Sequence, residues 1–337
     1  MNKPLILAYA FKDSLYSVTP DDAKRLTHIN LAFGHVGKDF KLDHRLLDKN
    51  IDYAETIRSF NPNIKFVISV GGWGAGGFSN MALTEEGREA FSASCAEYIF
   101  DHNLDGVDID WEYPCNDSAG IDADPRDKEN FTLLMRSLRK HVGNDKIVSI
   151  AAGGGDYFVR DTEMDKVSEV CDYVQLMTYD LRSGFCREAG HHTSLYPTKA
   201  DKSGISVDYT VNLFHKAGVP MEKMVIGAAF YSRHWKEVPN TDNGMLQNAG
   251  SLGNYGADYT GLVANFIGKN GFQKFWDEDA KAPYLFNGSE FISYDDPESI
   301  KAKCEYLLEK GLLGIMYWEH GNDQTHTLLK AMSDHLK

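Results

Sequence analysis

The chain of 337 residues is long enough for one large domain or two small ones, and its composition is that of an ordinary globular protein. Its 35 Lys and Arg residues against 49 Asp and Glu residues leave a net charge of −14. A chain this acidic repels phosphate backbones and anionic lipids, which argues against nucleic acid and membrane partners but permits a neutral polysaccharide.

Short apolar runs alternate with segments of helical periodicity along most of the chain, as is typical of parallel strands buried beneath helices. The predicted strands are 5–10, 28–34, 65–71, 105–111, 146–151, 173–179, 224–230 and 312–318. Eight strands that are each followed by a helix predict a (β/α)₈ barrel. An open doubly wound sheet is the alternative, but no glycine-rich phosphate turn follows the first strand.

Several predicted helices carry residues that typically start or end a helix. They are 84–101, capped by Thr84; 124–142, opened by Asp124-Pro125; and 296–310, opened by Asp296-Pro297 and closed by Gly311. A last helix near 323–336 completes the alternation.

One segment interrupts this rhythm. Residues 235–292 are rich in Gly, Asn, Asp and aromatic residues and have only a weak helical period. They lie between the seventh and eighth predicted strands, so we expect them to form an inserted subdomain. The barrel would then comprise residues 1–234 and 293–337.

The sequence leaves open whether the protein is secreted. No apolar run approaches the roughly 18 residues that span a bilayer. The first residues, KPLILAYAF, superficially resemble a short signal sequence, but no later stretch could replace them as the first strand. We therefore expect either a cytoplasmic protein or a secreted one whose signal lies outside this sequence.

The most informative segment is DGVDIDWE at residues 105–112. Alternate side chains of a strand share a face, so Asp108, Asp110 and Glu112 point one way and Trp111 points the other. In a barrel, the three carboxyl groups would line the axis toward the catalytic mouth. Like charges this close cannot all stay ionised, so their pKa values separate and one carboxylic acid stays protonated near neutral pH.

Two other interpretations of this strand are open. A solvent-exposed edge strand would explain the alternating acids, but not the apolar residues on the opposite face. A metal site would use the carboxylate oxygens as ligands. The strand has no histidine partner, however, and its acids follow one another along one strand instead of converging from several. We therefore expect chemistry that needs neither a metal nor a cofactor.

The same segment resembles the DxxDxDxE signature of family 18 glycoside hydrolases, the chitinase family. Further segments resemble other motifs of that family in the same order. They are SVGG at 69–72, QLMTYD at 175–180, FYSR at 230–233, with Ser232 in place of the commoner glycine, and YWE at 317–319. The resemblance implies a (β/α)₈ barrel with a small α+β insertion that hydrolyses chitin or chitooligosaccharides, and we expect it to act as a monomer.

The resemblance also implies roles for individual residues. In that family the N-acetyl group of the substrate is the nucleophile, so the product retains its anomeric configuration and the protein needs one acid. Glu112 would be that acid, and Asp110 would orient the acetamide. Asp108 would share a proton with Asp110, while Tyr179 would donate its hydroxyl to the acetamide oxygen. The expected substrate-binding residues are Trp318, Asp180, Met177, Gln175, Arg233, Tyr231, Tyr9, Phe33, Trp73 and Gly72.

Other functions are compatible with parts of this pattern. An endo-β-N-acetylglucosaminidase acting on glycoprotein glycans belongs to the same family. A chitin-binding lectin is a relative without catalysis, but such proteins usually lack the final acid, which this chain has as Glu112. A metal-dependent barrel hydrolase would lose activity on chelation, whereas the resemblance predicts no loss.

Overall fold

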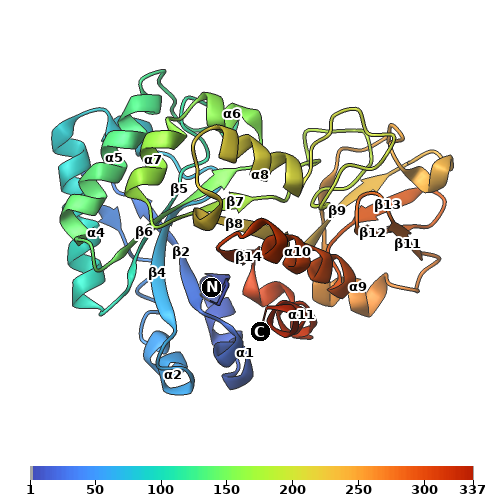
Figure 1. The fold of residues 1–337 in the computed structure, drawn as a ribbon, viewed down its shortest axis with the longest axis horizontal. Coiled ribbons are helices and arrows are strands. Elements are labelled where there is room, and N and C mark those ends of the chain that lie inside the picture. The colour runs from blue at the N-terminus through green and yellow to red at the C-terminus, as the bar shows by residue number, and fades with distance from the viewer. Residues whose placement is uncertain (1–2, 337) are drawn as a thin grey trace.

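Eight parallel strands form a closed barrel in the structure, a computed structural model that describes residues 3–336 (Figure 1). The strands are β1 (Leu5–Phe11), β2 (His28–Val36), β4 (Lys65–Gly71), β5 (Gly106–Asp110), β6 (Ile147–Gly153), β7 (Tyr173–Met177), β8 (Met224–Ala229) and β14 (Gly314–Trp318). Strand β1 pairs with both β2 and β14, which closes the sheet on itself. The short β3 (Leu42–Asp43) pairs antiparallel with the end of β2. The predicted (β/α)₈ barrel is confirmed, and each predicted strand is present.

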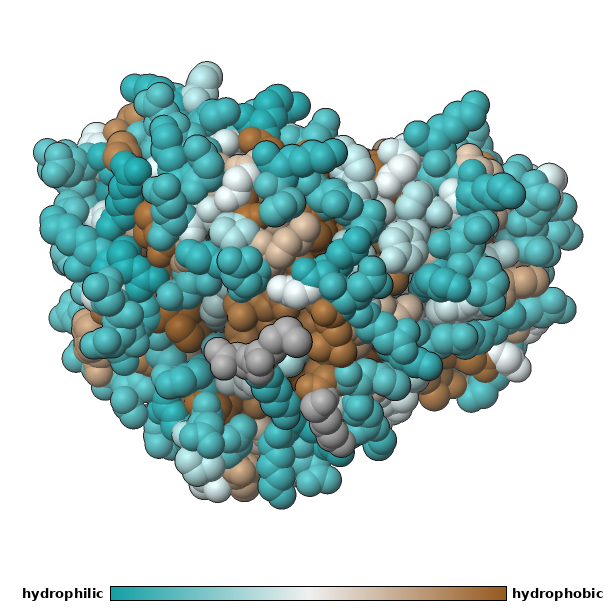
Figure 2. Space-filling model, viewed as in Figure 1, coloured by the Kyte–Doolittle hydropathy of each residue, from teal (hydrophilic) through white to brown (hydrophobic). Residues whose placement is uncertain are grey.

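Helices surround the barrel and cover the outer face of its strands (Figure 1). They are α1 (Pro20–Arg25), α2 (Tyr53–Phe60), α3 (Phe78–Ala82), α4 (Glu85–Asp101), α5 (Asp127–Val142), α6 (Asp156–Arg160), α7 (Met164–Val170), α8 (Val207–Lys216), α10 (Pro297–Lys310) and α11 (Thr327–His335). No helix in the described part of the chain is long and apolar enough to cross a membrane. Hydrophilic side chains cover most of the face seen in Figure 2, and its outline is notched between the barrel and the second sheet.

Strand alternation divides the apolar core into two layers. Ile6 and Ala8 of β1 face the helices and belong to the large outer core. Leu7 and Tyr9 face the barrel axis, where they pack with Met316 and Val225 of the neighbouring part of the barrel. The inward set is therefore the one that can bring side chains to the mouth of the barrel.

Two predicted helix starts agree with the structure. The Thr84 side chain accepts a hydrogen bond from the Gly87 backbone N–H, which caps α4. At the start of α10, Asp296 and Ser299 form a reciprocal capping box. Gly311 ends α10 in the left-handed conformation that favours glycine.

Two other predicted starts were wrong. Helix α5 begins at Asp127, not at Asp124, because the buried Asp127 carboxylate binds the backbone N–H groups of Asp124 and Cys115 and holds the preceding residues in a turn. Helix α11 begins at Thr327, not near residue 323, because the Asp323 carboxylate accepts from the Leu328 N–H across a turn. In both cases an acidic side chain accepts backbone N–H groups across the turn in front of the helix: Asp127 from residues ahead of α5, and Asp323 from the first turn of α11.

The chain between β8 and β14 forms a second, five-stranded antiparallel sheet, which lies beside the barrel (Figure 1). It consists of β9 (Tyr231–Lys236), β10 (Asn254–Asp258), β11 (Gln273–Asp277), β12 (Ala282–Phe286) and β13 (Glu290–Ser293), with α9 (Tyr259–Asn265) after β10. The sheet begins ahead of the expected boundary at residue 235, because the chain passes directly from the end of β8 into β9. The division into two domains remains a prediction.

A buried ion pair joins the second sheet to the barrel. The Lys303 ammonium of α10 lies 2.6 Å from the Asp295 carboxylate, and both side chains are almost fully buried. Asp295 follows β13, and its carboxylate also accepts from the Ala229 N–H at the end of β8. Because a buried charge is costly without its partner, this pair resists displacement of β13 relative to the barrel.

Candidate active site

A cleft of about 760 Å³ lies at the carboxyl ends of the barrel strands, the end at which barrels of this kind hold their sites. The barrel supplies one part of its wall, and β9 and β10 of the second sheet supply another. Most of the expected site residues line it. They are Tyr9, Phe33, Trp73, Asp110, Glu112, Met177, Tyr179, Asp180, Tyr231, Arg233 and Trp318.

Strand β5 delivers its acids to the axis of the barrel, as its alternation predicts. Trp111 points outward and packs against the Phe78 ring, with ring centroids 5.3 Å apart. Asp108 and Asp110 point inward and are buried. Glu112 lies two residues beyond the end of the strand and reaches the cleft. The three acids therefore sit at successive depths, with Asp108 deepest.

Asp108 lies beneath the floor of the cleft and accepts four hydrogen bonds. Its donors are the Tyr9 hydroxyl at 2.9 Å, the Ser69 and Ser149 hydroxyls at 2.8 Å each, and the Gln175 amide at 2.9 Å. Ser69 and Ser149 stand beside Asp108 in register on β4 and β6. Burial raises the pKa of Asp108, and the four donors oppose that rise.

Gln175 was expected to line the substrate site, and the structure places it elsewhere. Its side chain is fully buried between Asp108 and the Asn30 amide, whose N–H₂ group it accepts at 2.9 Å. It does not belong to the cleft wall. Because it sits two residues before Met177 on the same inward face of β7, it lies one layer below the mouth.

Asp110 is the buried acid that faces the cleft. Its pKa is raised well above the usual range, first by burial and then by the neighbouring Glu112 and Asp108 carboxyl groups. One of its oxygens, Oδ1, is buried and has no hydrogen-bond partner within the described chain. Since a buried polar atom without a partner is costly, this oxygen is available to a polar group of a bound ligand.

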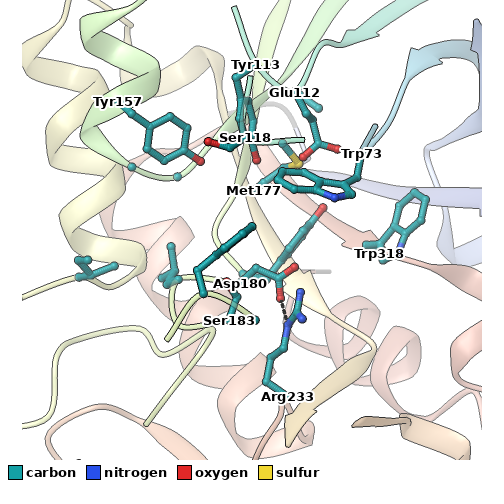
Figure 3. A pocket seen from close by; sticks show the side chains of 18 of the residues that line it. Trp73, Glu112, Tyr113, Ser118, Tyr157, Met177, Asp180, Ser183, Arg233 and Trp318 are labelled. Atoms are coloured by element: carbon teal, nitrogen blue, oxygen red, sulfur yellow. Dashed lines mark hydrogen bonds and ion pairs between the residues drawn. The ribbon is translucent and has the colours of Figure 1, made fainter. Parts of the chain in front are cut away.

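Glu112 has the electrostatic properties of a general acid. Burial and then the negative charge of Asp180 raise its pKa to about 7, against an opposing hydrogen bond from Tyr113. At that pKa a large fraction of the carboxyl groups carries a proton near neutral pH. Glu112, Met177 and Trp73 all line the cleft, and Figure 3 labels them there.

The residues after β7 form a second polar wall. Asp180 has a left-handed backbone with φ of 57°, which is uncommon for a residue other than glycine. Its carboxylate accepts from the Arg233 guanidinium of β9 at 2.6 Å (Figure 3). Although burial opposes the change, hydrogen bonds from His192 and Arg233 lower the pKa of Asp180 to about 2. Asp180 is therefore ionised, and its charge acts on Glu112.

Aromatic rings form the other side of the cleft. The Trp318 indole stacks on the Phe33 ring, with centroids 5.5 Å apart and an interplanar angle of 15°. The Tyr9 ring lies 5.7 Å from the same indole. Gly72, which was expected to bind substrate, is not part of the wall. A Cβ atom there would lie 2.7 Å from the Phe33 ring, so the glycine makes room for this packing.

A family model described as "Glycosyl hydrolases family 18" matches residues 6–323 of the chain. The chain belongs to this family. It is therefore a glycoside hydrolase, and the Asp108, Asp110 and Glu112 series lies within the matched region.

Several known proteins are similar to this family 18 hydrolase. It is 37% identical to Chitinase A1 of Niallia circulans over 83% of its own length, but it spans only 43% of that protein. It is 31% identical to Chitotriosidase-1 of Mus musculus, covering 88% of this chain and 67% of the relative. A solved family 18 N-acetylglucosaminidase from Paenibacillus barengoltzii matches with a TM-score of 0.96 and 48% identity, over 98% of this chain and 99% of that one.

The cleft of this family 18 hydrolase also contains residues that the motifs did not single out. Tyr113 directly follows Glu112, and Tyr157 lies beside it with ring centroids 5.0 Å apart. Phe185 is 76% exposed and lies 6.0 Å from Trp73, so two loops meet through these rings. Tyr255 of β10 stacks on the Arg233 guanidinium at 3.7 Å. Position next to a motif could have indicated Tyr113, but the others reach the cleft only when the chain folds, Tyr157 from α6 and Tyr255 from β10.

The described residues contain no group of three or more His, Cys, Asp or Glu side chains arranged to hold a metal ion. Asp110 and Glu112 instead stand among the aromatic rings and hydroxyl groups of the cleft. This donor set fits a neutral, hydroxyl-rich ligand that has both polar edges and apolar faces.

Proposed function

We propose that this family 18 hydrolase cleaves the β-1,4 linkages of chitin or chitooligosaccharides with retention of configuration, through an oxazolinium intermediate formed by the substrate itself. The observation that carries this proposal is the pairing of a buried Asp110 with a Glu112 whose pKa is raised to about 7, both facing one aromatic cleft. The chitinases among its relatives support the choice of substrate.

Glu112 is the proposed acid and base of the reaction. Its proton passes to the glycosidic oxygen as the C–O bond breaks, and the carboxylate then removes a proton from the water that opens the oxazolinium ring. The raised pKa supports this role, because an acid must hold its proton near the pH at which it works.

The acetamide of the cleaved sugar is the proposed nucleophile, and three residues prepare it. Asp110 accepts the acetamide N–H through its free oxygen and stabilises the positive charge that develops on the ring. Tyr179 donates its hydroxyl to the acetamide oxygen. The prediction that Asp108 shares a proton with Asp110 remains a proposal; the four hydrogen bonds to Asp108 support a role in fixing the floor below.

The remaining wall residues are proposed to bind the sugar rings. Trp318 is held by Phe33 and Tyr9 and offers its open face to the apolar face of a pyranose. The side chains of Asp180 and Arg233 would bind the hydroxyl groups of the sugar. The residues proposed for these contacts are Trp318, Asp180, Met177, Arg233, Tyr231, Tyr9, Phe33 and Trp73.

A product time course on N-acetylglucosamine oligomers of defined length tests this function. We expect hydrolysis in which the new reducing end appears as the β-anomer in early ¹H NMR spectra, because the acetamide and the water attack successively from opposite faces. Oligomers without the N-acetyl group at the cleaved sugar are the matched control and should not be cut there. Release of the α-anomer would contradict the proposal, and so would equal rates on both substrates.

A second candidate is the release of single N-acetylglucosamine units from chain ends. The similarity over 99% of the N-acetylglucosaminidase from Paenibacillus barengoltzii favours it. The same time course separates the two. Monomer as the first product from a hexamer supports end-directed release, whereas mixed shorter oligomers support internal cleavage.

The pH profile of kcat/KM should fall on the alkaline side near pH 7. Glu112 must be protonated to act as an acid, and burial with the Asp180 charge raises its pKa to about 7. Activity is therefore present below that pH and lost as the pH rises through it. In an Asp180→Asn variant the alkaline limb should move to lower pH, because the nearby negative charge is gone. A rate that stays constant from about pH 5 to about pH 9 would contradict this assignment.

A further inference from the structure

His192 is a fully buried histidine that the proposed mechanism does not use. It lies in the segment between β7 and α8, and its side chain is 0% exposed. Its Nδ1 atom lies 3.4 Å from the backbone nitrogen of Asp180 and 3.5 Å from the Asp180 carboxylate. The ring therefore faces both the backbone and the side chain of one residue in the cleft wall.

The surroundings of His192 fix the ring in place. Its backbone N–H donates to the Ser293 hydroxyl at the end of β13, at 2.9 Å, and its carbonyl accepts from the Leu181 N–H at 3.0 Å. The ring packs against the Tyr231 ring, with centroids 5.4 Å apart. Thus β13 and the residues after β7 hold the backbone of His192, and Tyr231 of β9 packs against its ring.

The polar atoms of the ring are used only toward Asp180. The second ring nitrogen, Nε2, is buried and has no hydrogen-bond partner in the described part of the chain. The charged groups that face the ring are Asp180, Arg233 and Asp295, and Asp295 is paired with Lys303. Burial lowers the pKa of His192, while Asp180 opposes that change. A neutral imidazole with Nδ1 at this place can either donate to the carboxylate or accept from the backbone N–H.

Asp180 needs such support, because its left-handed backbone is unfavourable for a residue with a side chain. Arg233, on the second sheet, donates a hydrogen bond to the Asp180 carboxylate. The structure shows no hydrogen bond between Arg233 and the Asp180 backbone nitrogen. His192 approaches both. It can therefore fix the conformation of the residue, while Arg233 fixes only the end of its side chain.

The geometry points to His192 as a positioning residue that holds Asp180 in its left-handed conformation with the carboxylate directed at the catalytic cleft. This inference rests on the proposed function for its effect on rate, since Asp180 acts on the substrate and on Glu112. The inference predicts that a polar atom at the Nδ1 position is required to hold Asp180, whereas the rest of the imidazole only fills space.

Amide side chains test this atom by atom. Asparagine places a polar atom near the Nδ1 position, whereas glutamine places it near the unused Nε2 position, so His192→Asn and His192→Gln differ mainly in which contact survives. On N-acetylglucosamine oligomers, His192→Gln should lower kcat/KM about 10-fold and move the alkaline limb of the pH profile to lower pH. His192→Asn should stay within about 2-fold of the unchanged protein in kcat/KM and keep its pH profile.

Equal losses in the two variants would overturn the inference, as would an unchanged His192→Gln protein. Should glutamine not fit the buried site, as judged by circular dichroism, His192→Ala replaces it, because alanine removes the ring without adding atoms.

Crystal structures of the variants supply a readout that does not depend on activity. The φ angle of Asp180 should remain in the left-handed region in His192→Asn and leave it in His192→Ala; an unchanged Asp180 in the alanine variant would overturn the inference. An unsubstituted protein that hydrolyses no N-acetylglucosamine oligomer would instead contradict the proposed function, so the two failures are distinguishable.

Discussion

Replacing Glu112 with glutamine should lower kcat on N-acetylglucosamine oligomers by on the order of 10³-fold, the size expected when a positioned general acid is lost. Glutamine has nearly the same shape but carries no transferable proton. Burial raises the pKa of Glu112 to about 7, but a glutamine amide does not titrate and so cannot supply the proton. The measurement is single-turnover or steady-state kinetics, with products followed by chromatography.

Binding measurements show whether the loss is chemical. The Glu112→Gln protein should bind a chitooligosaccharide with nearly unchanged affinity in isothermal titration calorimetry, because the rings of Trp318 and Phe33 remain in place. Its melting temperature should not fall, since removing an ionisable group from a buried position relieves a desolvation cost. A variant with near-normal turnover would refute the assignment of Glu112.

Asp110→Asn should lower kcat by about 10²-fold with a smaller change in KM, as expected for an interaction that strengthens in the transition state. The amide oxygen can still accept the acetamide N–H, but an amide cannot become the carboxylate that would stabilise the charge developing on the proposed oxazolinium. The loss should be seen on every oligomer that the unsubstituted protein hydrolyses, because the roles proposed for Asp110 and Glu112 concern the same sugar.

Asp105 offers a matched control on the same strand segment. It lies on the opposite parity and pairs with Lys65 at 2.8 Å and Arg58 at 3.4 Å, away from the cleft. Asp105→Asn should therefore leave kcat unchanged, whatever it costs in stability. A comparable loss of kcat in both variants would show that removing any acid here disturbs the strand, and would contradict a specific role for Asp110.

The side chains of the acidic strand that share a face could be predicted from the sequence, because this depends only on the local geometry of a strand. Alternation along β5 fixes which acids face inward, and the apolar Val107, Ile109 and Trp111 can only face the helices. The barrel could be predicted for the same reason, since each strand and helix carries its own periodicity. Helix starts were less predictable. Asp127 and Asp323 bind backbone groups whose position depends on the preceding turn.

Depth within the barrel could not be predicted. Gln175 and Met177 have the same parity on β7, and only the closed barrel shows that Gln175 lies below the floor beside Asp108 while Met177 reaches the cleft. The role of Gly72 could not be predicted either, because it depends on the Phe33 ring of another strand.

The sequence by itself determined which acids lie on one strand and which face they share, because side chains along a strand alternate with a period of two residues. It also determined the barrel family, because a motif of eight consecutive residues identifies it. The tertiary structure decided how those acids ionise and what surrounds them. Asp180 and His192 come from different parts of the segment between β7 and α8 and meet Arg233 of β9, and together they set the charge that acts on Glu112. Burial and contacts between distant segments exist only in the folded chain, and they determine the pKa values on which acid catalysis depends.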